Sequence, residues 1–165
     1  MKKLLAILIC TVFLCGCTSE PVYETIGDSD EVPVMSTAYK VSVLLPEEAS
    51  EPVMQSGGET LYRCENYSVM VNRLDGGDLN RTVQSVTGMD PSALTVLKTE
   101  RDGFPCYRIA WSAAGEDGLQ VCRCVILDDG AMHHAVTVMA DHSIADRLIE
   151  QWNHVLDSVC LISTG

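Results

Sequence analysis

The stretch of sequence that decides the fold is Leu119–Ala140, which reads LQVCRCVILDDGAMHHAVTVMA. Two apolar runs rich in β-branched residues, 119–127 and 132–140, lie on either side of Asp128-Asp129-Gly130. β-Branched side chains favour strands, and an Asp-Gly pair supplies the positive φ that a tight hairpin needs. The sequence therefore predicts an antiparallel hairpin at this place.

Further short strands are predicted on the N-terminal side of this hairpin. Residues 39–45 alternate between apolar and polar side chains until Pro46, as a strand with one buried face does. Similar runs separated by Gly, Asp and Asn occur at 60–64, 67–74, 94–100 and 106–112. Strands joined by such short turns are typical of an antiparallel sheet.

Two helices are predicted between and after the strands. In the first, Asp78 can cap a run of apolar residues at helical spacing, and Gly88 ends it. In the second, Ser143 is the expected cap, followed by one apolar stripe: Ile144, Leu148, Trp152, Val155 and Val159. Together the elements predict an α+β domain, an antiparallel sheet of about six or seven short strands covered by two helices.

The N-terminus predicts export and a lipid anchor. Residues 1–16 combine a short basic segment with the apolar run 4–14, which is the pattern of a secretory signal. That run spans roughly 16 Å as a helix, about half of a hydrocarbon core, so a permanent membrane span is not expected. Leu14-Cys15-Gly16-Cys17 resembles the lipobox of bacterial lipoproteins, although Cys15 departs from its usual small residues. The resemblance implies that Cys17 carries diacylglycerol and further acyl chains; an ordinary secretory signal is the alternative.

Composition limits what the exported part can do. Residues 17–37 are expected to be the lipidated cysteine with a flexible acidic tether, and 38–163 a single domain. After residue 16 the chain has nine lysines and arginines against 23 aspartates and glutamates, a formal charge of −14. Nucleic acid is not expected as a partner, because phosphate binding needs a basic stripe and no cluster of lysines and arginines follows Lys3. The lipid would hold the chain to the outer face of the cytoplasmic membrane, or to the outer membrane of a Gram-negative host.

Five cysteines remain once the signal peptide and Cys17 are set aside: Cys64, Cys106, Cys122, Cys124 and Cys160. An odd number leaves at least one free thiol. Buried thiols can act as small apolar side chains, whereas export favours disulfide bridges. The sequence leaves two alternatives open, five free thiols or one or two bridges.

Cys122, Cys124 and His134 are the residues to consider for a metal site. Cys122 and Cys124 share one strand face, and a turn centred on residues 129 and 130 would place Cys124 opposite Ala135. A slip of one residue would bring His134 beside Cys124, which would suit zinc or a soft metal. The competing interpretation is that both cysteines fill the core while one of His133 and His134 is exposed. No metal and no cofactor other than the lipid is predicted.

No catalytic residue is predicted either. Cys106 or Cys160 could be combined with His154 and Asp157, but a His and an Asp three residues apart on a helix are typical of an exposed face. The acidic pairs at 116–117 and 128–129 are expected at hairpin tips and lack an EF-hand pattern. Residues of one strand face are expected in the core: Tyr107, Ile109 and Trp111.

The domain also resembles the PsbP-like fold of photosystem II extrinsic proteins, which occurs in small bacterial lipoproteins. The segments that carry the resemblance are 39–46, YKVSVLLP, and 152–161, and it covers roughly 38–163. It implies a non-enzymatic accessory or binding subunit, without any binding residue carried over. The leading hypothesis is a domain presented to an envelope protein; the alternatives are a small-molecule or metal-binding lipoprotein and, behind these, an envelope hydrolase or thiol enzyme.

Replacing Cys17 tests the anchor. Cys17→Ala should move the protein from the membrane fraction to the periplasm or medium, because no lipid can then be attached. Fractionation followed by immunoblotting measures this. A variant that still sediments with membranes would contradict the anchor.

Overall fold

The computed structural model describes residues 38–115 and 118–164. The signal peptide, Cys17 and the tether lie outside the described residues. The strands are β1 (Tyr39–Ser42), β2 (Met54–Ser56), β3 (Glu59–Arg63), β4 (Ser68–Asp75), β5 (Leu97–Arg101), β6 (Phe104–Gly115), β7 (Gly118–Asp128), β8 (Met132–Asp141) and β9 (Cys160–Ser163). The helices are α1 (Leu79–Thr87), α2 (His142–Ala145) and α3 (Ile149–Ser158), with short 3-10 turns η1 (Glu47–Ala49), η2 (Pro91–Ala93) and η3 (Asp146–Leu148).

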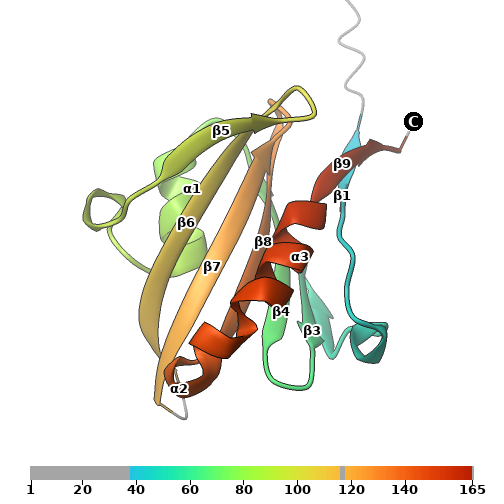
Figure 1. Ribbon diagram of the computed structural model, residues 1–165. Helices are drawn as coiled ribbons and strands as arrows, with labels where there is room; N and C mark the ends of the chain where they lie inside the picture. Colours follow the sequence, from blue (N-terminus) through green and yellow to red (C-terminus); the bar gives the residue numbers. More distant parts are fainter. Residues whose placement is uncertain (1–37, 116–117, 165) are drawn as a thin grey trace, which may run out of the picture. The chain divides into compact units, whose positions relative to one another are not determined.

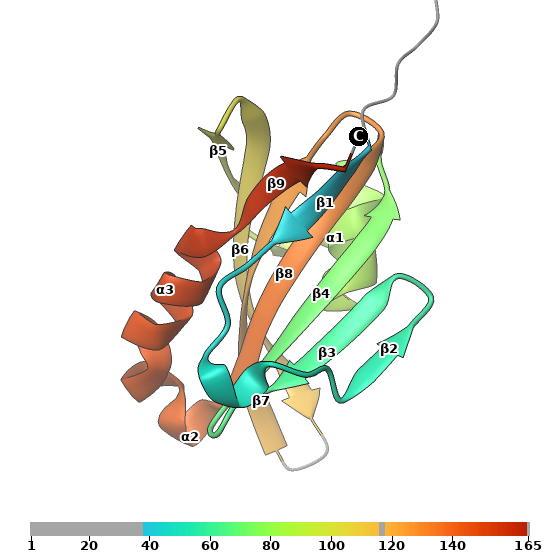
Figure 2. The same ribbon diagram turned by 90° about the vertical axis from the view of Figure 1, so that its right-hand side faces the viewer.

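Seven strands form one antiparallel sheet in the order β2-β3-β4-β8-β7-β6-β5, and β1 pairs with β9 in a separate ribbon (Figures 1 and 2). The predicted α+β class is therefore confirmed. β2 and β9, which have three and four residues, were not predicted as strands. In the described part of the chain no helix is long and apolar enough to cross a membrane.

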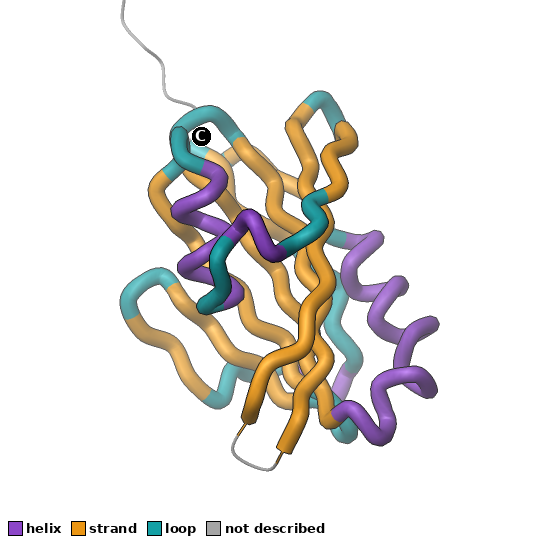
Figure 3. Tube along the Cα trace, turned by 90° about the vertical axis from the view of Figure 1, so that its left-hand side faces the viewer, coloured by secondary structure: helices purple, strands orange, loops and turns teal. Residues whose placement is uncertain are grey.

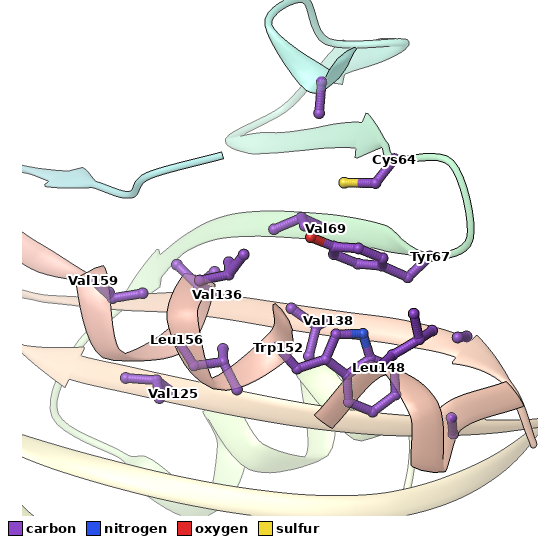
Figure 4. Close-up of a cluster of buried hydrophobic side chains, with 14 of the residues drawn as sticks. Cys64, Tyr67, Val69, Val125, Val136, Val138, Leu148, Trp152, Leu156 and Val159 are labelled. Carbon is purple, nitrogen blue, oxygen red and sulfur yellow. The ribbon is translucent and has the colours of Figure 1, made fainter. Parts of the chain in front are cut away.

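The central strands β7 and β8 are covered on both faces. One face packs against α3 and the β1–β9 ribbon, and Figure 4 shows Trp152 beside Val138 and Tyr67 in this cluster. Its side chains with at most 1 % exposure are Ala49, Val69, Cys106, Val125, Leu127, Val136, Val138, Trp152, Val155 and Val159. Burial on both faces removes the apolar side chains of these strands from water, and this hydrophobic effect is the main contribution to the stability of the sheet.

The opposite face packs against α1, so that helices lie on both sides of the sheet (Figure 3). Asp78 caps α1 as predicted, accepting the Arg81 N–H at 3.2 Å. Gly88 ends the helix with a φ of 69°, a left-handed conformation that favours glycine. The predicted core face of β6 is confirmed here, packed with Val83 of α1: Tyr107, Ile109 and Trp111.

The C-terminal helix begins earlier than predicted and is interrupted. Asp141, rather than Ser143, is the cap, because Asp141 Oδ1 accepts a hydrogen bond from the Ser143 N–H at 2.8 Å. η3 then separates α2 from α3. The predicted apolar stripe is confirmed, although its last residue, Val159, follows the helix.

The predicted register of the β7–β8 hairpin is wrong by two residues. Cys124 lies opposite Thr137 instead of Ala135, and Asp128 lies opposite His133. The turn is centred on Gly130 and Ala131, one residue later than predicted, and the Asp129 N–H donates to the Met132 oxygen across it at 3.1 Å. Asp129 Oδ1 accepts the N–H groups of Ala131 and Met132 at 2.9 and 2.7 Å.

Asp129 also joins this turn to the sheet. Its Oδ2 lies 2.8 Å from Nε2 of His134, and its side chain is only 5 % exposed. Burial alone would raise the pKa of Asp129, but the hydrogen bonds from His134 and from the Met132 and Ala131 N–H groups outweigh it and hold the pKa below its usual value. The ionised carboxylate is therefore the form that stabilises the turn.

The pH dependence of Asp129→Asn tests this role. A carboxyl group whose pKa is lowered by folding stabilises the protein above its unfolded pKa of about 3.9, and the contribution is lost as the pH falls through the folded pKa. Asp129→Asn should therefore lower the free energy of unfolding by roughly 1–3 kcal/mol at pH 7, with a difference that narrows below pH 4.

Urea unfolding at pH 7 and pH 3 measures this difference, with exposed Asp75→Asn as the matched control. A variant as stable as the wild type at pH 7 would contradict the role of Asp129, as would a difference that does not change with pH.

Candidate functional site: an arginine-lined groove beside α3

The residues weighed as a metal site are not brought together. Cys122 and Cys124 lie on the α1 face of the sheet, opposite Trp111 and Ile109 of β6. His134 lies on the other face, because the register places it opposite Leu127. Among the described residues, no group of three or more His, Cys, Asp or Glu side chains could hold a metal ion.

The five cysteines of the domain are all free thiols. Burial raises the pKa of Cys122 to about 11 and that of Cys124 to about 12. Both thiols therefore stay protonated at neutral pH and fill the core as small apolar side chains. Of the two alternatives that the sequence left open, the structure has the five free thiols.

The expectation that one of His133 and His134 is exposed is wrong. Both are buried, with exposed fractions of 2 % and 1 %. His133 Nδ1 lies 2.6 Å from the Thr82 hydroxyl of α1, and its Nε2 lies 3.6 Å from Asp128. Each histidine thus has a polar partner inside the fold, an arrangement that holds α1 and the β7–β8 turn against the sheet.

The catalytic group considered above, Cys106 or Cys160 with His154 and Asp157, is not formed in the structure either. Cys106 lies in the core beneath α3. His154 and Asp157 both project from α3, but Asp157 pairs with Arg108 of β6 at 2.6 Å. Among the described residues, no hydrogen bond joins His154 to Asp157, so these side chains do not form a nucleophile with its base.

A groove of about 290 Å³ lies between α3 and the strands β5 to β7. α3 crosses the sheet next to β8 and leaves the same face of β5 and β6 open (Figure 1). The lining residues are Thr95, Leu97, Arg108, Ile109, Ala110, Arg123, Cys124, Val125, Asn153 and Leu156. Two arginines and no carboxylate line this groove, in a chain whose formal charge is −12.

Strand pairing places the two arginines on one face. Arg108 pairs with Val125, and Ala110 pairs with Arg123, so the four side chains alternate between charged and apolar. Val125 is fully buried, and Leu156 of α3 adjoins it, which gives the groove an apolar floor.

The two lining arginines and Arg101 of β5 differ in the groups that their guanidinium groups contact. Arg101 Nη1 donates to the backbone oxygens of Leu156 and Val159, at 2.8 and 2.9 Å, and so satisfies carbonyls at the C-terminal end of α3. Arg108 Nη2 donates to Asp157 Oδ1 at 2.6 Å. Arg123 is partly buried, and its guanidinium has neither a hydrogen bond nor an ion-pair partner within the described residues.

A guanidinium above an apolar floor can bind a carboxylate that is attached to an apolar group. The planar fork of Arg donates two parallel hydrogen bonds to such an anion, while the floor removes apolar surface from water. Sequence reasoning missed this groove. The available signal was Arg123 itself, a charged residue inside the apolar run 121–127.

The other flank of α3 has the opposite charge. A groove of about 480 Å³ lies between α3, η1 and the β3–β4 turn, and three glutamates with one histidine line it: Glu48, Glu65, Glu150 and His154. α3 therefore separates a basic groove from an acidic one.

No protein-family model and no curated protein sequence matches the chain. Among solved structures, the domain is similar to cyanobacterial PsbP (CyanoP) of Synechocystis, with a TM-score of 0.54 and 12 % identity over 79 % of this chain and 96 % of that protein. It is also similar to a protein of Bacteroides thetaiotaomicron, with a TM-score of 0.52 and 10 % identity over 76 % of this chain. The similarity spans 46 % of the Bacteroides protein, about half its length. These likenesses support the predicted PsbP-like fold, and at such identity they show the fold alone.

Proposed function

We propose that this chain is an exported, non-enzymatic lipoprotein whose domain binds a partner protein of the cell envelope through the arginine-lined groove. In this proposal Cys17 carries the diacylglycerol anchor, residues 18–37 are the tether, and the domain operates on the outer face of a membrane. The partner contributes an acidic side chain next to an apolar one.

The observation that carries the proposal is the unpaired guanidinium of Arg123. A partly buried charge loses hydration, and without a partner it gains no contact in return. The chain has 23 acidic residues, yet none of those in the described part pairs with Arg123. A carboxylate from outside would offset the lost hydration, and arginines in such settings often dominate the binding energy of protein interfaces.

Two features of the charge distribution support a lipid as the membrane anchor and a protein as the ligand of the domain. An acidic domain is repelled by anionic headgroups, so its surface contributes little to membrane attachment. The acidic and basic flanks of α3 offer a partner complementary charges on both sides of one helix, which favours one orientation and a fast encounter.

The state of the thiols and histidines supports a binding role over catalysis. A thiol reacts as its thiolate, and burial holds Cys122 and Cys124 in the protonated form. His133 and His134 are enclosed and hydrogen-bonded within the fold, away from the groove. A small anionic amphiphile is the second candidate ligand, because the apolar floor beside Arg108 and Arg123 suits it as well.

Charge reversal at Arg123 tests the proposed site. The tagged full-length chain is crosslinked in its native host, and captured envelope proteins are quantified by mass spectrometry. Arg123→Glu should reduce the captured partner at least tenfold, which corresponds to about 1.4 kcal/mol, because it places a carboxylate where the partner's carboxylate binds.

Arg81→Glu is the matched control, since Arg81 is exposed on α1 and the change in net charge is the same. Equal capture by Arg123→Glu and Arg81→Glu would contradict the proposed groove. The absence of any envelope protein above background, with an anionic lipid bound to the purified chain instead, would favour the second candidate.

A further inference from the structure

β1 is paired along one edge only. Its register with β9 places Lys40 opposite Ile162 and Ser42 opposite Cys160, and the Ala38 oxygen accepts the Thr164 N–H at 2.9 Å. Because hydrogen bonding alternates along an antiparallel pair, the backbone groups of residues 38, 40 and 42 point to β9. Those of Tyr39 and Val41 point away from β9, and β1 pairs with no other strand in the described part of the chain.

A groove runs along this open edge. It has a volume of about 660 Å³ and lies between β1 and the β2–β4 part of the sheet. Figure 2 shows β9 on one side of β1, with β4, β3 and β2 beyond its other side. Tyr39, Lys40 and Val41 form one wall of this groove, and residues 55–60 and 71–73 contribute to the other.

The groove is positively charged in an otherwise acidic chain. Lys40 and Arg73 line it with exposed side chains and have no ion-pair partner among the described residues. The one acidic residue in the lining is Glu59, whose carboxylate accepts a hydrogen bond from Asn72 Nδ2 at 2.9 Å. Asn72 lies opposite Ala135 of the α1-face cluster, so this carboxylate is on the far face of the sheet from β1. An acidic ligand along β1 would therefore meet two cations that have no ion-pair partner among the described residues.

We propose that the open edge of β1 is a second binding surface, which accepts an extended acidic segment of a partner protein as a third strand of the β1–β9 ribbon. The unpaired N–H and C=O groups of Tyr39 and Val41 bond to the backbone of the added strand, as in other β-strand additions. Lys40 and Arg73 select for Asp or Glu side chains on it. This surface is separate from the arginine-lined groove.

A second copy of the chain would be a poor occupant. The edge strands of the large sheet are β2 and β5, which read MQS and LKTER. β2 contains no acidic residue, and β5 contains one glutamate against a lysine and an arginine. Neither strand complements the charge of Lys40 and Arg73.

A random heptapeptide library displayed on phage, selected against the full exported chain in detergent, tests the proposal. Selected peptides should alternate Asp or Glu with β-branched residues and lack proline, because proline cannot donate to a strand ladder. Peptide binding should slow amide hydrogen exchange at Tyr39 and Val41.

The double variant Lys40→Glu/Arg73→Glu should weaken binding of a selected peptide at least tenfold. Arg81→Glu/Arg147→Glu, which changes two exposed arginines elsewhere, should not weaken it. Arg123→Glu should also leave it unchanged, so the outcome is independent of the arginine-lined groove.

Three results would overturn the proposal. One is a set of selected peptides without acidic residues, and another is unchanged exchange at Tyr39 and Val41 on binding. The third is concentration-dependent dimerisation that protects the same two amides, which would make a second copy the occupant.

Discussion

The hairpin β7–β8 is buried on both faces, and this burial determines where the helices and the β1–β9 ribbon pack. Each face needs a cover, so α1 packs on one and α3 with the β1–β9 ribbon on the other. α3 lies next to β8, and the same face of β5 and β6 stays open to its side. Arg108 and Arg123 lie at this border, where the strand period places them on the α3 face but α3 does not cover them. The arginine-lined groove therefore exists because α3 covers the sheet beside β8 but does not extend over these two side chains.

Local patterns in the sequence predicted most of the elements. Alternation and β-branched residues identified the long strands, and Asp78 with Gly88 identified the ends of α1. β2 was missed because three residues are too few to show a period, and β9 because it directly follows the apolar stripe of the last helix. The register of β7–β8 was wrong because the turn is centred one residue later than predicted, on Gly130 and Ala131, where the Asp129 side chain accepts two backbone N–H groups. A backbone turn rule does not include such side-chain bonds.

The candidate site was less predictable than the fold. Cys122 and Cys124 were recognised as neighbours on one face, but Arg123 between them projects to the opposite face and was passed over. Whether that arginine has a partner depends on α3, which is about thirty residues further along the chain and meets it only through tertiary packing. The burial of His133 was missed for the same reason, since its partner Thr82 lies in α1, 51 residues away in the sequence.

Site-specific photocrosslinking in the native host tests most directly whether the arginine-lined groove is the partner site. A photoreactive phenylalanine analogue would replace either Leu97, at the groove, or Leu119, at the β6–β7 end of the sheet; the two are similarly exposed, at 59 % and 50 %. We predict one envelope-protein adduct from position 97, lost on adding Arg123→Glu, and no such adduct from position 119. Equal adducts from both positions, or an adduct from position 119 alone, would contradict the account.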